Sequence, residues 1–457
     1  MPDLEFQRAR GRKFLADARP ELLATARLGM PLVLAELGWM AMGLVDTAFV
    51  GRVSAEALAG VSLGAILFYG VAVCSGGVLL GMDTLVSRAF GAGDREDYRA
   101  WLWNGAWLAA GFVPLVMCCV ALLEPVLVAT GIDPTILRTA RPYVRALNWS
   151  TAPLFLYFVL RRYLQAIHVV RPVMFALVSA NLVNLAGNWV LVLGNLGAPR
   201  MGAEGSGWAT CISRVYMAAV LVAALVWRDR GVLRTRQWPE WTRITELVQL
   251  GLPAAGQIGL EIGVFSLVTV LVGKLNAIQL AGHQIALVTV STTYMMPLGI
   301  SSAAAVRVGH ALGRTDSKAA ARSGWTALGL GAVVMSAAAI VLLTVPRWIA
   351  RIFTVDANVI EAAVVLLRVA AFFQLFDGLQ VVATGALRGV GDTRTPMLAH
   401  FAGYWLVGLP VGAVLCFHYG LGAAGLWAGL SSGLILIGIG LAFWWWRTSR
   451  TKLMVGL

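Results

Sequence analysis

One constant offset relates the two halves of this sequence. A single shift along the chain places residues 28–31 on 250–253, Gly51 on Gly273, residues 58–60 on 280–282, and Gly91 and Asp94 on Gly313 and Asp316. Each match is short, but chance does not readily repeat one spacing. A duplicated, strongly apolar chain is typical of secondary transporters, whose substrate and ion sites lie near the membrane midplane between the repeats.

Composition restricts the chain to the membrane. Of its 457 residues, 59% are hydrophobic and 13% are charged. A soluble globular protein carries about 25% charged residues, so this chain lacks the polar side chains to cover a water-facing surface. The five cysteines lie mostly in apolar runs without metal-ligand spacing, and we interpret them as packing residues. The sequence therefore predicts an all-α, polytopic membrane protein.

Apolar stretches of about 20 residues, the length that crosses a bilayer, predict twelve transmembrane helices. Six fall in each half, so both repeats have the same orientation in the membrane. The predicted spans are 28–50, 57–82, 102–123, 143–166, 173–195, 203–227, 246–271, 281–305, 323–345, 361–386, 397–418 and 422–446. They divide the chain into a cytoplasmic lead-in (1–27), an N-terminal lobe (28–227), a linker (228–245), a C-terminal lobe (246–446) and a tail (447–457).

The net charge of +13 is high enough to suggest nucleic-acid binding, but its distribution indicates membrane topology instead. Most Lys and Arg residues fall at the two ends of the chain and in the loops after even-numbered spans, as in the clusters at 8–13 and 228–236. Basic residues favour the cytoplasmic side, so we place both termini there and expect no nucleic-acid partner. We expect no cleavable signal peptide, because the first apolar run begins near Leu28 and has full spanning length.

Acids inside the predicted spans are the main candidates for function. A carboxylate at the bilayer centre costs roughly 2.5–3.5 kcal/mol on insertion scales, so such residues usually face a cavity. Four acids qualify: Glu36, Asp46, Glu261 and Asp377. Burial disfavours the charged form, and carboxylate oxygens also bind hard cations. We predict coupling-ion roles for Asp46, Glu261 and Asp377. The alternative is a structural acid hydrogen-bonded to a neighbouring helix. For Glu36 the sequence favours neither the coupling role nor the structural role.

Other polar residues in the spans could complete an ion site. Asn184 and Asn188 share one helix face. They could hold helices together by hydrogen bonding, or supply carbonyl oxygens beside Asp46. Thr210 offers a further oxygen, although a threonine in a membrane helix often bonds its own backbone.

Residues near the second pair of acids are candidates for a substrate surface. Gln257 lies one turn before Glu261, and Gln380 follows Asp377 by three residues, so each could orient its acid or touch substrate. Further candidates, for which packing between helices is the alternative, are Phe265, Phe373 and the methionines Met40, Met42, Met295 and Met296.

Enzyme signatures do not appear in the sequence. The five histidines are scattered, and neither HExxH, GxSxG nor a P-loop occurs. We therefore expect neither an enzyme nor a resident cofactor, and no ATP-driven transport by this chain alone.

Several segments together resemble the multidrug and toxic compound extrusion (MATE) family, and most closely its NorM-type bacterial branch. The similarity covers nearly the whole chain in register. The segments are 43–51 in the first span, 172–189, 202–205 and 209–210 in the fifth and sixth, 281–286 in the eighth, and 377–382 and 387–392 in and after the tenth.

The resemblance implies two six-helix lobes that form a V-shaped central cleft, and exchange of sodium or protons for organic, often cationic, compounds. It implies a second-lobe cation site at Glu261 and Asp377, where sodium would bind. In the first lobe it implies a site made by Asp46, Asn184, Asn188 and Thr210. We place Gln284 of the eighth-span segment in the substrate cleft, together with the candidates named above.

The chain departs from the family pattern at two positions. Phe373 stands where NorM-type proteins can carry a tyrosine, four residues before the acid of the tenth span, and this removes a hydroxyl ligand. Some relatives carry an acid where Asn188 stands, so we expect the first-lobe site to hold its ion weakly or to serve protons only. Glu36 matches no functional position of the family.

These features predict a monomeric antiporter of the bacterial cytoplasmic membrane, which expels bulky, mostly cationic drugs in exchange for Na⁺ or H⁺. The alternative is a flippase for a lipid-linked saccharide, a class of related architecture. Such proteins usually have extra terminal helices and a basic cavity, whereas the candidate groups here are acids. A channel or structural membrane protein is a third class, in which these acids would be dispensable.

Overall fold

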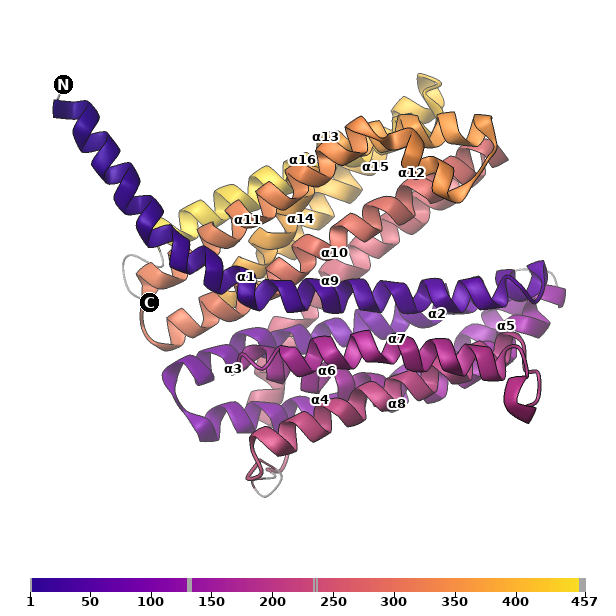
Figure 1. Ribbon diagram of the computed structural model, residues 1–457, viewed down its shortest axis with the longest axis horizontal. Helices are drawn as coiled ribbons and strands as arrows, with labels where there is room; N and C mark the ends of the chain where they lie inside the picture. Colours follow the sequence, from indigo (N-terminus) through magenta and orange to yellow (C-terminus); the bar gives the residue numbers. More distant parts are fainter. Residues whose placement is uncertain (1, 130–133, 233–234, 236, 452–457) are drawn as a thin grey trace. The chain divides into compact units, whose positions relative to one another are not determined.

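The computed structural model describes residues 2–129, 134–232, 235 and 237–451 (Figure 1). Residues 233, 234 and 236 of the predicted linker and 452–457 of the predicted tail lie outside the described residues. The helices of the first half are α1 (Pro2–Val50), α2 (Ala55–Gly77), η1 (Val78–Leu80), α3 (Gly81–Ala92), α4 (Arg95–Ala129), α5 (Pro134–Trp149), α6 (Thr151–Ala166), α7 (Arg171–Leu191), η2 (Asn195–Gly197) and α8 (Ala203–Arg228).

The second half has the same helical character. Its helices are α9 (Trp241–Gly273), α10 (Ala277–Gly313), α11 (Ser317–Thr344), α12 (Pro346–Phe353), α13 (Ala357–Val390), α14 (Arg394–His400), η3 (Phe401–Gly408), α15 (Leu409–Ala413), η4 (Val414–His418) and α16 (Gly422–Thr451). Helices α14 to η4 follow one another without a break, and η3 and η4 are π-helical turns.

Within the described residues, eleven helical segments are long and apolar enough to cross a membrane. They confirm eleven of the twelve predicted spans. The remaining one, 143–166, falls on α5 and α6, which have 16 residues each. Ser150 separates them, and its amide donates a hydrogen bond to the carbonyl of Leu147 at 3.0 Å, a tighter turn than that of an α-helix. Neither helix alone has the length of a span, but together they cover the predicted range.

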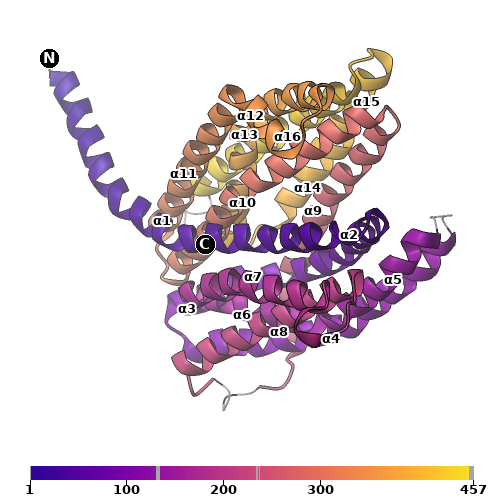
Figure 2. The same cartoon turned by 45° about the vertical axis from the view of Figure 1, so that its right-hand side comes forward.

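The chain forms two compact units, each with its own apolar core. Unit 2 comprises Leu34–Gly259, and unit 1 comprises Met1–Val33 and Leu260–Leu457. In unit 2, α7 and α8 pack side by side in both views (Figures 1 and 2). In unit 1, α13 packs against α10, α11 and α16. The unit borders fall inside α1 and α9, at residues 34 and 260, and the lobe borders predicted at 28 and 246 fall earlier in the same two helices.

The contacts of α1 and α9 repeat with the offset found in the sequence. In unit 2, a Cβ atom on Gly77 would lie 2.8 Å from the Cα atom of Ala255 on α9. In unit 1, a Cβ atom on Gly299 would lie 2.5 Å from the backbone nitrogen of Val33 on α1. The shift that places residues 28–31 on 250–253 also relates Gly77 to Gly299 and Val33 to Ala255. Each unit therefore packs the start of the helix that opens one repeat against the second long helix of the other repeat.

Helix capping repeats in the same way. A polar side chain accepts a hydrogen bond from the backbone three residues ahead, which satisfies an otherwise unpaired amide of the first turn. The pairs are Ser54 with Ala57 (3.0 Å) and Asn276 with Gln279 (2.8 Å), and Asp94 with Asp97 (3.0 Å) and Asp316 with Ala319 (2.9 Å).

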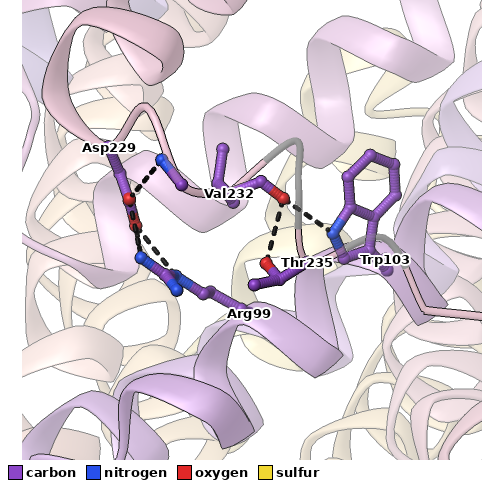
Figure 3. A network of polar contacts seen from close by, with 6 residues as sticks. Arg99, Trp103, Asp229, Val232 and Thr235 are labelled. Carbon is purple, nitrogen blue, oxygen red and sulfur yellow. Dashed lines mark hydrogen bonds and ion pairs between the residues drawn. The ribbon is translucent and has the colours of Figure 1, made fainter.

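The predicted linker is fastened to α4 of unit 2 (Figure 3). Arg99 donates to both carboxylate oxygens of Asp229, at 2.6 Å to Oδ1 and 2.7 Å to Oδ2. One turn further along α4, the indole N–H of Trp103 donates to the carbonyl of Val232 at 3.2 Å, and the hydroxyl of Thr235 donates to the same carbonyl at 3.1 Å. The segment between the two repeats is thus a structural part of unit 2.

Candidate functional site

Asp46 lies inside unit 2, on α1, and its carboxylate accepts three hydrogen bonds. Asn184 and Asn188 on α7 donate to Oδ1 from their Nδ2 atoms at 2.9 and 2.7 Å. Thr210 on α8 donates to Oδ2 at 2.7 Å. All four side chains are buried. The structure therefore brings together the four residues predicted for the first lobe, which we name the Asp46 site.

The side-chain amides of Asn184 and Asn188 can turn either the NH₂ group or the carbonyl oxygen toward the centre of the Asp46 site. In the observed arrangement Asn184 and Asn188 turn N–H groups toward Asp46, which suits an ionised carboxylate because it only accepts hydrogen bonds. Their Oδ1 atoms are buried and have no hydrogen-bond partner within the described structure. The two ends of an amide are nearly alike in shape, so a rotated amide would offer its oxygen to a cation or to a protonated acid.

The second site lies inside unit 1 and is built around Asp377 on α13 and Glu261 on α9. Gln380 donates from Nε2 to Asp377 Oδ1 at 3.0 Å and lies 3.5 Å from the hydroxyl of Tyr404. The hydroxyl of Tyr294 on α10 lies 3.4 Å from Glu261 Oε2. The two parts of the site meet at η3 (Phe401–Gly408): the indole N–H of Trp405, which follows Tyr404, donates to the carbonyl of Leu260, which precedes Glu261, at 3.1 Å. We name Asp377, Glu261, Gln380, Tyr404 and Tyr294 the acid-pair site.

No basic side chain of the described residues forms an ion pair with either acid of this site. Asp377 is buried and Glu261 is half-buried. Two neighbouring like charges sheltered from water are relieved by a proton or a bound cation. The Oε1 atom of Gln380 is buried without a hydrogen-bond partner in the part that the structure describes. Two carboxylates, an amide oxygen and phenolic oxygens form a ligand set that suits a hard cation.

The π-helical turn η3 places Tyr404 in this site. Tyr404 is fully buried, and its ring meets Phe265 of α9 edge-on, with 5.9 Å between ring centroids. Local π-helical turns are often found at functional sites. The predicted substrate contact of Phe265 stays a prediction, because in this structure the ring packs on Tyr404.

Phe373 belongs to a second group of rings next to the acid-pair site. It is 2% exposed and lies 6.1 Å from the Trp427 ring of α16. The indole N–H of Trp427 donates to Nδ1 of His283 at 2.9 Å, and Nε2 of His283 lies 2.8 Å from the hydroxyl of Thr269. An indole N–H only donates, so Nδ1 carries no proton and His283 is the neutral Nε2–H tautomer.

The remaining substrate-surface candidates lie on α9 and α10. Gln257 is half-buried and belongs to unit 2, while Glu261, one turn later on the same helix, belongs to unit 1. Gln284 is exposed and Met295 is half-buried, both on α10 in unit 1. Their contact with substrate stays a prediction.

The contacts of Glu36 favour the interpretation that it is a structural acid. Its carboxylate forms an ion pair and hydrogen bond with Arg161 of α6, and the side chains of the two residues are 8% and 5% exposed. Since the arginine balances its charge, Glu36 is not available to a mobile ion in this arrangement. Among the residues that the structure describes, no cluster of three or more His, Cys, Asp or Glu side chains could hold a metal ion.

Comparisons with known proteins agree with this architecture. A family model described as MatE matches residues 31–190 and 253–414, two segments whose first residues are related by the same offset as the sequence repeat. A protein of Mesorhizobium japonicum named "Probable multidrug resistance protein NorM" is 36% identical over 94% of this chain and 95% of its own length. A protein of the same name from Rhodopseudomonas palustris is 38% identical over 94% and 93%.

Solved structures have the same fold. The crystal structure of a eukaryotic MATE transporter matches with a TM-score of 0.85 at 20% identity, over 95% of this chain and 98% of that one. An outward-facing multidrug resistance MATE family transporter matches with a TM-score of 0.86 at 19% identity, over 94% and 97%. The duplicated helical units define a multi-pass membrane protein of the transporter fold. The chain belongs to the MATE family, and its relatives at 36–38% identity are NorM-type bacterial proteins.

Proposed function

We propose that this protein is a secondary active antiporter that expels organic, mostly cationic, compounds in exchange for Na⁺ or H⁺. The observation that carries the proposal is the acid-pair site, where the buried Asp377 and the half-buried Glu261 belong to unit 1 and have no basic partner among the described residues. The names of the NorM-type relatives, multidrug resistance proteins, support the same substrate class.

The acid pair couples two ligands through its charge. With both acids ionised, the site attracts a cationic substrate; with a proton or sodium ion bound, that attraction weakens. A ligand shifts a conformational equilibrium only by its differential affinity for the two states. Neutralising the acids therefore has two effects. It favours the conformational state to which the coupling ion binds more tightly, and it weakens the binding of the cationic drug. A membrane potential adds about 2.3 kcal/mol per inward-moving charge per 100 mV.

The same features support a membrane, a topology and an oligomeric state for the protein. The basic residues at both ends of the chain support cytoplasmic termini, and the bacterial origin of its relatives supports the cytoplasmic membrane. Each site is assembled within a single unit of one chain, which supports a working monomer. A flippase for a lipid-linked saccharide is less favoured, because the acid-pair site holds two carboxylates that form no ion pair among the described residues and would repel a pyrophosphate.

The test is transport of the fluorescent cation ethidium across proteoliposome membranes, under an imposed sodium gradient and separately under a proton gradient. We expect one of the two gradients to drive transport by the wild-type protein. Asp377→Asn removes one of the two charges and should abolish gradient-driven transport while the protein still inserts and folds. Glu361→Gln is the matched control, because Glu361 is an exposed acid paired with Arg347 at 2.7 Å.

Two results would count against the proposal. Normal gradient-driven transport by Asp377→Asn would remove the acid-pair site from the mechanism. If neither gradient moves the dye through wild-type protein, antiport of organic cations loses its basis, and transbilayer movement of a lipid-linked saccharide becomes the function to assay.

A further inference from the structure

Arg214 is a buried cation of unit 2 that has no carboxylate in ion-pair contact among the described residues. It lies on α8 and is 1% exposed. Its guanidinium donates to the hydroxyls of Ser150 and Tyr69, the latter at 3.0 Å. The rings of Phe68 and Tyr69 face it at 4.9 and 5.4 Å from their centroids. An arginine inside a span is costly to bury and commonly marks function, and aromatic faces compensate only part of its charge.

Asp46 is an acid that reaches α8 on the helix face of Arg214. Thr210 precedes Arg214 by four residues and therefore shares its face of α8. The hydroxyl of Thr210 donates to Asp46 Oδ2 at 2.7 Å, so Asp46 meets α8 one helical turn before the backbone position of Arg214. Opposite charges on one face of a buried helix attract each other, because the medium around them has a low dielectric constant.

The buried acids of unit 2 follow one pattern. Glu36 pairs with Arg161, Asp83 lies 3.3 Å from Arg162, and Asp46 is bonded to Thr210, one helical turn before Arg214. The acid-pair site of unit 1 has no such partner among the described residues. One unit therefore balances its buried negative charges with its own arginines, and the other holds two acids whose charges an external cation or proton must balance.

We propose that Arg214 is the built-in cation of the Asp46 site, which takes the place of a mobile metal cation there and confines sodium binding to the acid-pair site. This deepens the proposed function and rests on it for its role in transport. A sodium ion beside Asp46 would meet the charge of Arg214 in a medium of low dielectric, where like charges repel strongly. Without that charge, the site retains a carboxylate, two amide oxygens that can turn inward and a hydroxyl. Such a set of oxygens suits sodium.

The experiment is equilibrium binding of radioactive sodium to detergent-purified protein, with no drug and no gradient. All variants carry Asp377→Asn, which disables the acid-pair site and leaves the Asp46 site to be measured by itself. With Arg214 present we expect no saturable sodium binding. Adding Arg214→Gln should create one saturable site, and adding Asp46→Asn to that variant should abolish it. Arg214→Lys keeps the charge and should bind no sodium.

Three outcomes would overturn the inference. The first is Asp46-dependent sodium binding while Arg214 is still present. The second is a well-folded Arg214→Gln variant without new binding. The third is equal binding by Arg214→Gln and Arg214→Lys. Because the assay involves no transport, failure of ethidium transport in proteoliposomes would count against the proposed function and leave this result intact.

A second measurement keeps the inference testable if Arg214→Gln alone folds poorly. Asp46→Asn leaves Arg214 unbalanced, whereas Asp46→Asn with Arg214→Gln removes both charges. We expect the double variant to unfold at a higher temperature than Asp46→Asn alone. An equal or lower unfolding temperature would show that the two charges are not balanced against each other, and would overturn the inference.

Discussion

The ion pair between Glu36 and Arg161 gives the sharpest quantitative prediction. Glu36→Gln leaves the guanidinium of Arg161 buried without its carboxylate, and the side chains of the pair are only 8% and 5% exposed. Removing one partner of a buried pair costs about 3–5 kcal/mol, because the remaining charge is uncompensated. For a domain of roughly 150–250 residues, 1 kcal/mol shifts the unfolding temperature by about 2–4 °C. We therefore expect a decrease on the order of 10 °C.

Thermal unfolding of the detergent-purified protein, followed by tryptophan fluorescence, measures this shift. The matched control is Glu361→Gln, which breaks the ion pair with Arg347, where the side chains are 59% and 63% exposed. An exposed pair contributes about 0–1 kcal/mol, so the control should barely change the unfolding temperature. Glu36→Gln combined with Arg161→Met removes both charges and should recover more than half of the loss.

Equal unfolding temperatures for the Glu36 and Glu361 variants would refute the reasoning, since burial would then have no energetic consequence. Transport separates the structural role from a coupling role. A folded Glu36→Gln protein should still respond to the driving gradient, because its ion-paired carboxylate is not available to the coupling ion. Loss of gradient response at normal stability would return Glu36 to the candidate coupling acids.

Two further predictions use the same unfolding assay. Gly299→Ala places a Cβ atom 2.5 Å from the backbone nitrogen of Val33, and this overpacking should lower the free energy of unfolding by about 1–3 kcal/mol. The control Gly43→Ala meets no atom within 4 Å and should raise the free energy of unfolding by up to about 1 kcal/mol. Equal effects of the two substitutions would contradict the close packing of α1. Trp427→Phe leaves Nδ1 of His283 without its hydrogen-bond donor and should lower the free energy of unfolding by about 1–3 kcal/mol. An unchanged free energy of unfolding would argue against the assigned tautomer of His283.

Much of the fold was predictable because its signals are local. Each span is a continuous apolar run, and the duplication is a fixed spacing along the chain. The Asp46 site was predictable for a similar reason. Asn184 and Asn188 stand four residues apart in an apolar helix, and a polar pair on one face must find partners among the few polar groups available inside the protein.

The partners of buried groups could not be predicted from local signals. Arg161 lies 125 residues from Glu36, and Trp427 lies 144 residues from His283. Spacing along the chain does not show such pairs, so histidines without a motif appeared unimportant. Tyr404 depends on a π-helical turn, whose hydrogen-bond register is invisible to hydropathy. A sign of its role was available, since a tyrosine in an apolar span needs a partner for its hydroxyl.

The border of the two units inside α1 and α9 makes the two repeats depend on each other during synthesis. The segment Met1–Val33 emerges from the ribosome before the rest of unit 1, Leu260–Leu457, exists. It therefore lacks its contacts with the rest of unit 1 until the whole first repeat and then α10 have been synthesised. A gene cut between the repeats would yield one fragment with that segment unpartnered and another with the start of α9 unpartnered. Although one offset relates the two repeats, neither repeat encodes a complete unit, so each unit is complete only when both repeats have been synthesised.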